Sequence, residues 1–119
     1  MCKQSRLRQR KEFDAVFRQG CIWANDLLVL RSLLNHLDHN RYGFVTSKRL
    51  GRAVVRNRVR RRLREALRAL PLLAGWDIVI SARASAGRSD FHDLKKAVAK
   101  LLDRAGVLSR DLSPGETPS

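Results

Sequence analysis

The stretch RAVVRNRVRRRLREALR, residues 52–68, carries eight arginines and one glutamate. Aliphatic residues recur through it, and just beyond it, at the spacing of one helical face: Val55, Val59, Leu63, Ala66, Leu67 and Leu70. This periodicity predicts a helix with one apolar side that packs against a core. Pro71 is expected to end the helix. The other sides of the helix are then almost entirely cationic, which points to a polyanionic partner.

The charge pattern of this helix differs from that of an ordinary solvated face. Solvated faces mix signs, because like charges four residues apart cost a few tenths of a kcal/mol. Here that unfavourable spacing repeats, and Glu65 alone offsets it. The arginines at four-residue steps are Arg56, Arg60, Arg64 and Arg68. Because guanidinium groups offer phosphate a fork of donors at any working pH, the stretch predicts polyanion binding.

The flanking segments predict strands and two further helices. They are a helix from a Ser5 cap to Gly20, strands over 26–34, 41–47 and 76–83, a polar loop over 35–40, and a last helix that Ser89 or Asp90 caps and that ends near Gly106. This order predicts an α+β fold, a small mixed sheet packed with helices in the order αββ(β)αβα. We expect one domain over 1–119, with a disordered tail at 111–119.

Composition narrows the class of protein. The chain has 119 residues, a formal net charge of +14 and a pI of about 11.5, so nucleic acid is the first partner to consider and a membrane surface the second. No apolar run approaches the ~18 residues of a membrane span, and no signal sequence is recognisable, which favours the cytoplasm. Cys2 and Cys21 predict neither a disulfide nor a zinc site; we expect Cys2 exposed and Cys21 half-buried.

The chain offers no convincing hydrolytic group of its own. His36 and His39 flank Asp38, but a solvated loop tip explains this cluster better than an acid–base pair. No acidic residues are spaced to hold two Mg²⁺ ions. The sequence therefore predicts a protein that contributes binding rather than bond breaking.

Folded RNA suits the basic helix better than a DNA groove does. A helix-turn-helix reader needs a second helix across a short turn, whereas strands flank this helix, and its arginines spread around more than half its circumference. Composition alone assigns four aromatic residues to the core: Phe13, Phe17, Tyr42 and Phe44. A structured-RNA-binding protein such as a ribosomal protein, and less favourably a DNA-compacting protein, remain open at this point.

The segment TSKRLGRAVVRNRVRRRLREALR resembles the signature of the bacterial ribonuclease P protein subunits. Their Arg-Asn-Arg motif corresponds to residues 56–58, with Lys48 and Gly51 upstream. The N-terminal pattern of the family is matched by Arg6, Leu7, Phe13, Val16, Phe17 and Gly20. The segments GFVTSKR and WDIVISAR are also similar, so the resemblance covers residues 5–105.

The resemblance implies a division of labour. A large RNA carries the catalytic site and its Mg²⁺ ions, and the protein assists an endoribonuclease that removes the 5′ leader of precursor tRNA. Catalytic RNA and precursor tRNA are the implied partners, with no organic cofactor, membrane or obligate protein partner. The resemblance also implies a left-handed crossover around the basic helix, against the usual right-handed rule.

The resemblance assigns roles by position. The residues expected to face the catalytic RNA are Lys48, Arg49, Arg52, Arg56, Asn57, Arg58, Arg60, Arg61 and Arg64. Phe13 and Phe17 are expected to meet leader nucleotides as partly exposed platforms. Arg31 stands where many relatives have an aromatic residue, so a stacked guanidinium or a phosphate contact is the expected substitute there.

Overall fold

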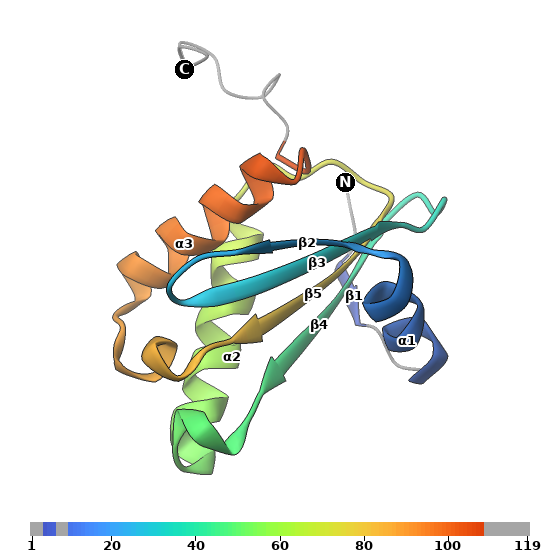
Figure 1. The fold of residues 1–119 in the computed structure, drawn as a ribbon. Coiled ribbons are helices and arrows are strands. Elements are labelled where there is room, and N and C mark those ends of the chain that lie inside the picture. Colours follow the sequence, from blue (N-terminus) through green and yellow to red (C-terminus); the bar gives the residue numbers. More distant parts are fainter. Residues whose placement is uncertain (1–3, 7–9, 109–119) are drawn as a thin grey trace, which may run out of the picture.

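The computed structural model describes residues 4–6 and 10–108 as a sheet with helices on both of its faces (Figure 1). The strands are β1 (Gln4–Arg6), β2 (Cys21–Ala24), β3 (Leu28–Leu34), β4 (Asn40–Thr46) and β5 (Trp76–Ala82). The helices are α1 (Arg10–Gln19), α2 (Ala53–Arg68) and α3 (Phe91–Arg104), with short 3₁₀ turns η1 (Lys48–Leu50) and η2 (Ala84–Arg88). The α+β class and the mixed sheet predicted from the sequence are confirmed.

The sheet has five strands in the order β1-β4-β5-β3-β2. β4 runs parallel to β5, whereas β3 is antiparallel to β5 and forms a hairpin with β2. The apolar alternation in β3 and β5 buries Leu28, Leu30, Ile78 and Ile80 on one face, which explains why these segments form strands. Pairing of distant segments therefore builds the centre of the sheet.

The connection from β4 through α2 to β5 is a left-handed crossover. In Figure 1, α2 lies behind the sheet, both strands run towards the lower left, and β5 lies above β4. Viewed from the helix side with the strands pointing up, β5 therefore stands to the left of β4. This is the exception to the right-handed rule that the family resemblance implied.

The main core lies between the sheet and the pair α2 and α3. From α2 it takes Val59, Leu63, Ala66 and Leu67, which are all buried, with Val55 and Leu70 half-buried at the ends of the stripe. α3 adds Leu94, Ala97, Val98, Leu101 and Leu102. The apolar face predicted for residues 52–70 is thereby confirmed, and the arginines occupy the remaining sides of α2.

On the opposite face of the sheet, α1 is the only α-helix among the described residues (Figure 1). There Val16 and Val79 are fully buried and form a small second cluster, against which Phe13 and Leu33 pack. Tyr42 is buried in the main core, as the sequence predicts, and Phe44 packs against this core half-buried. The two faces of the sheet therefore differ: one carries most of the apolar packing, and the other carries a single short helix.

The predicted start of the first helix is wrong. Ser5 lies in β1, which pairs in parallel with β4, and α1 begins at Arg10, so Ser5 caps no helix. α2 ends before Pro71, at Arg68, with Ala69 as its cap. Of the two caps predicted for α3, Asp90 is confirmed, because its carboxylate accepts from the Asp93 backbone N–H at 2.8 Å.

Cys21 is exposed rather than half-buried. It begins β2, which the pairing order places at the edge of the sheet, where no neighbouring strand covers it. Cys2, Leu7 and the predicted tail at 111–119 lie outside the described residues.

Candidate nucleic-acid interface

The outward sides of α2 carry its cationic residues in two classes of exposure. Arg52, at the N-cap, and Arg61, Arg68 and Asn57 are exposed. The half-buried ones are Arg56, Arg58, Arg60, Arg62 and Arg64. Within residues 4–6 and 10–108, no carboxylate pairs with the six arginines at 52, 56, 58, 60, 61 and 62. Their charge therefore remains available to a polyanion.

Two arginines of α2 also tie the helix to the segment before α3. Arg58 donates from Nη2 to the carbonyl of Gly87 at 3.2 Å, and Arg62 donates from Nη1 to the carbonyl of Ser89 at 3.0 Å. A neutral carbonyl satisfies a donor without cancelling the charge. These side chains are thus anchored in place while they remain cationic.

Arg60 links α2 to the end of β4 and orients its neighbour. It donates from Nη1 to Thr46 Oγ1 at 2.7 Å and from Nη2 to the side-chain oxygen of Asn57. Because the Asn57 oxygen accepts from Arg60, its amide N–H groups are the ones left to face a partner. Arg64 stacks over the Phe44 ring, with 5.8 Å between Cζ and the ring centroid. Both arginines therefore have a structural contact as well as a charge.

The turn η1 brings further cations to the start of α2. Leu50 is buried and anchors the turn, whereas Lys48 and Arg49 are exposed. Gly51 joins η1 to α2 with a φ of 128°, a backbone conformation that favours glycine. Lys48, Arg49 and Arg52 thus gather at the N-terminal end of α2. The structure brings together all nine residues expected to face the catalytic RNA.

The other predicted set lies on the opposite face of the sheet, beside α1. Phe17 is 43% exposed, and the guanidinium of Arg31 on β3 lies 4.5 Å from its ring centroid. Phe13 is half-buried against Val16 and Val79. The structure thus brings Phe17 and Arg31 into contact, with Phe13 one turn earlier on the same helix. Phe17 is outside the core to which composition assigned it, because α1 covers only part of the sheet.

Sequence reasoning missed the sheet surface next to this pair. Pairing register places Ile22 beside Arg31, and Val45 and Val29 on either side of Ser81, all on the face that carries Arg31. Ile22 is 57% and Val45 38% exposed. We call Ile22, Val29, Arg31, Val45 and Ser81, together with Phe17, the α1-side surface. Strand alternation could have revealed Val29 and Val45, but the unpredicted strand β2 hid Ile22.

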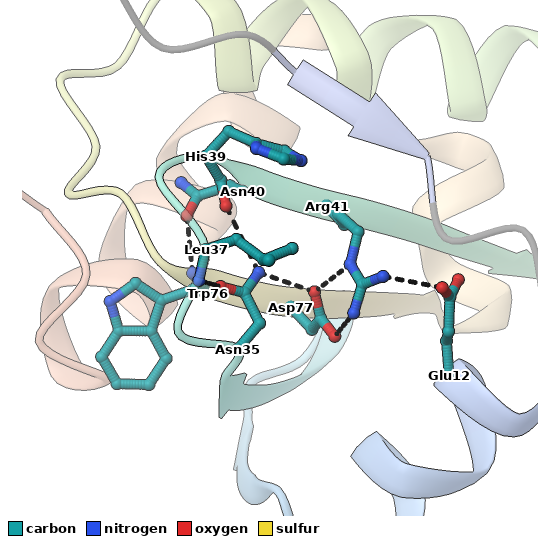
Figure 2. A network of polar contacts seen from close by, with 8 residues as sticks. All are labelled: Glu12, Asn35, Leu37, His39, Asn40, Arg41, Trp76 and Asp77. Atoms are coloured by element: carbon teal, nitrogen blue, oxygen red, sulfur yellow. Dashed lines mark hydrogen bonds and ion pairs between the residues drawn. The ribbon is translucent and has the colours of Figure 1, made fainter.

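A polar network on the same face was also missed. Arg41 on β4 donates to both carboxylate oxygens of Asp77 on β5, at 2.7 and 2.6 Å, and to Glu12 on α1 at 2.6 Å (Figure 2). The pKa of Arg41 is raised, first by the hydrogen bond to Asp77 and further by the charges of Asp77 and Glu12, against the opposing effect of burial. These residues are far apart in the chain, and no local pattern joins them.

The described part of the chain provides little for metal chemistry. His39 Nδ1 and Asp38 Oδ1 lie 2.8 Å apart at the exposed β3–β4 loop. Across residues 4–6 and 10–108, no group of three or more His, Cys, Asp or Glu residues is placed to hold a metal ion. None of the described helices is long and apolar enough to cross a membrane.

Known proteins match this chain over nearly its whole length. A family model described as Ribonuclease P matches residues 1–106. The ribonuclease P protein component of Roseiflexus castenholzii is 45% identical over 121 residues, covering 99% of this chain and 98% of that protein. That of Dehalococcoides mccartyi strain CBDB1 is 40% identical over 110 residues, covering 92% of each chain.

Solved structures match in fold as well. The RNase P protein of Staphylococcus aureus superimposes with a TM-score of 0.81 at 30% identity, covering 90% of this chain and all of that chain. The RNase P protein of Thermotoga maritima gives a TM-score of 0.75 at 31% identity, covering 84% of this chain and 96% of that chain.

Proposed function

This chain belongs to the Ribonuclease P family as its protein component, and on that premise we propose how it divides its two surfaces between RNA partners. The basic side of α2 binds the catalytic RNA of the enzyme, and the α1-side surface binds the 5′ leader of precursor tRNA. The enzyme is then an endoribonuclease whose bond-breaking step belongs to the RNA. The proposal places this work in the cytoplasm, where precursor tRNA is made.

The observation that carries the first half is the uncompensated charge of α2. The arginines at 52, 56, 58, 60, 61 and 62 have no carboxylate partner among the described residues, and Arg58, Arg60 and Arg62 are held in fixed positions by carbonyl and hydroxyl groups. Pre-positioned guanidinium groups lose little side-chain entropy when they bind, and their donor fork matches phosphate oxygens. Asn57, oriented by Arg60, adds an amide donor among them. This combination suits a folded RNA surface of fixed shape.

The second half of the proposal rests on the α1-side surface. Phe17 and Arg31 form a stacked pair, and exposed aliphatic side chains of the sheet lie beside it. Nucleotide bases stack on aromatic rings and on guanidinium planes with little dependence on sequence. A single-stranded leader of variable sequence is the RNA that such a surface fits. Phe13 would meet it at the edge, because the second apolar cluster holds part of its ring.

The Mg²⁺ ions of the reaction are assigned mainly to the RNA. Glu12 and Asp77, two carboxylates on the α1 side of the sheet, are paired with Arg41. The protein would act on the ions indirectly, because arginines that neutralise phosphates reduce the Mg²⁺ needed to fold the RNA. No organic cofactor enters the proposal.

One reconstitution experiment tests the whole proposal. Catalytic RNA and precursor tRNA are combined with and without the protein over a Mg²⁺ series, and leader removal is followed. We expect faster removal with protein, a lower Mg²⁺ requirement, and tighter binding of precursor than of mature tRNA by the complex. An unchanged Mg²⁺ requirement would contradict the role of α2, and equal affinity for the two tRNAs would contradict the leader role.

A ribosomal or general RNA-binding role is the alternative from another class, and charge alone fits it equally well. The two functions differ in which RNA should co-purify with the protein from cells. The proposal expects one RNA of a few hundred nucleotides, whereas a ribosomal role expects ribosomal subunits.

A further inference from the structure

The short helix α1 is joined to the sheet by one ion-pair network. Arg41 on β4 donates hydrogen bonds from Nε and Nη2 to Asp77 on β5, and from Nη1 to Glu12 on α1 (Figure 2). Asn35 donates to the same Asp77 carboxylate at 2.9 Å from the end of β3. Contacts from β4, β5 and the end of β3 thus fix the plane of the Arg41 guanidinium. Glu12 of α1 binds the remaining nitrogen of that guanidinium.

The network is shielded from solvent. The side chains of Asp77, Glu12 and Arg41 are 5%, 19% and 22% exposed. Exposed ion pairs are weak because water screens them and because two mobile side chains must be ordered. Here Asp77 already orders Arg41, and burial limits the screening, so Glu12 binds a pre-positioned partner.

The rest of the α1 attachment is small. Val16 packs on Val79 midway along the helix, and Gly20 lies against the Ser32 backbone at its C-terminal end. In the N-terminal half, Phe13 packs against the same cluster, and Glu12 adds the polar contact with Arg41. Because Phe13 and Phe17 lie on one helix, the angle of α1 on the sheet sets how both rings stand over the α1-side surface.

We infer that Glu12 and Arg41 are positioning residues for leader recognition: their ion pair sets the placement of α1, and through it the placement of Phe13 and Phe17. This inference rests on the proposed leader role of the α1-side surface. It assigns no direct RNA contact to Glu12, whose negative charge would repel a phosphate.

Glu12→Ala is the clean variant. Removing Glu12 leaves Arg41 paired with Asp77, whereas removing Arg41 would leave Asp77 buried without its cation and endanger the fold. Asp14→Ala is the matched control, because Asp14 is exposed on the same helix and its loss changes the net charge equally. Electrostatics alone predicts that both variants bind RNA slightly more tightly. A positioning role of Glu12 predicts instead that the two variants differ in their preference for precursor over mature tRNA.

Each variant is assembled with catalytic RNA, and binding of precursor and mature tRNA is compared. We expect Glu12→Ala to reduce the preference for precursor by roughly 10-fold, which is below the ~10²-fold that a 1 Å misplacement can cost. The KM for precursor tRNA should rise, whereas kcat should stay at the wild-type value. Asp14→Ala should retain the wild-type preference, and Glu12→Gln should recover part of it, because its amide oxygen still accepts from Arg41. Affinity for the catalytic RNA should not fall in any of the three.

Hydrogen exchange of the free protein provides a readout independent of tRNA. Faster exchange in the first turns of α1, with α2 unchanged, is expected for Glu12→Ala and not for Asp14→Ala. Equal precursor preference in the two variants, with the wild-type preference intact, would overturn the inference alone. A wild-type complex without precursor preference would overturn the leader role and the inference with it.

Discussion

Arg56 and Arg58 stand two residues apart on α2 and meet different surroundings. Arg58 donates to the Gly87 carbonyl, which packs so closely that a Cβ on Gly87 would lie 2.9 Å from the Leu50 carbonyl oxygen. The Arg56 side chain donates to none of the described residues, and its Nε is buried without a partner there. Arg58 therefore has a structural contact, whereas the Arg56 side chain has none among the described residues.

Alanine substitutions at Arg56 and Arg58 separate a role in RNA binding from a role in stability. Arg56→Ala and Arg58→Ala should each weaken binding to the catalytic RNA, by roughly 1.5–3 kcal/mol for a charge-assisted hydrogen bond, and the double variant by a few kcal/mol. Arg58→Ala should also lower the free energy of unfolding by about 0.5–1.5 kcal/mol. RNA titration and denaturant unfolding measure both quantities. A stability loss in Arg56→Ala as large as that in Arg58→Ala would show that Arg56 is structural instead.

Among the helices and strands, the packing of α1 against the sheet depends on Gly20. Gly20 ends α1 with its backbone N–H donating to the Val16 carbonyl at 2.9 Å. A Cβ there would lie 2.5 Å from the Val16 oxygen and 2.9 Å from the Ser32 oxygen on β3. Both obstacles are backbone atoms, so the helix itself would have to move. The helix C-terminal signal read from the sequence thus also marks a close approach of helix and sheet.

Gly20→Ala is expected to displace α1 and to destabilise the protein by about 1–3 kcal/mol, the usual cost of overpacking. Gly106→Ala is the comparison: Gly106 has a φ of 77° and no atom within 4 Å of a built Cβ, so it should cost only about 1–2 kcal/mol of backbone strain.

Unfolding and tRNA binding together distinguish the two glycine variants. Only Gly20→Ala should reduce the preference for precursor over mature tRNA. The same preference in both variants would indicate that leader binding tolerates movement of α1.

At the scale of the whole molecule, two surfaces of different chemistry occupy opposite faces of one sheet. The α2 side presents guanidinium groups, and the α1 side presents a stacked pair among apolar side chains. The sheet keeps these surfaces at a fixed separation, because its central strand β5 is mostly buried between helices. The proposed function uses both surfaces, one for each RNA segment.

The salt dependence of RNA binding should report this arrangement. With a net charge of +14, contacts to about 6–10 phosphates would lower affinity for the catalytic RNA by roughly 10³–10⁵ between 50 and 200 mM salt. Precursor preference should change much less, because stacking on the α1 side releases few counterions. Titrations at several salt concentrations measure both. A shallow dependence for the catalytic RNA would contradict the role given to α2.

Local patterns in the sequence were enough to predict α2, its buried face and the class of its partner. The helical spacing of Val55, Val59 and Leu63 predicted the buried face of α2. The many arginines on its other sides predicted a polyanionic partner. The Arg-Asn-Arg motif and the paired phenylalanines, read as a family likeness, led to the family and to both candidate surfaces. Periodicity and charge along one segment need no knowledge of its neighbours.

Features that join residues distant in the chain became visible only in the fold. β1 forms because β4 offers it a parallel edge, so Ser5 joins a strand although its sequence suits a helix cap. Ile22 enters the α1-side surface only through its register with Arg31. Arg41 links Glu12 and Asp77 across 29 and 36 residues. The physical reason is that strand pairing and ion pairing depend on positions in space, which a local pattern does not specify.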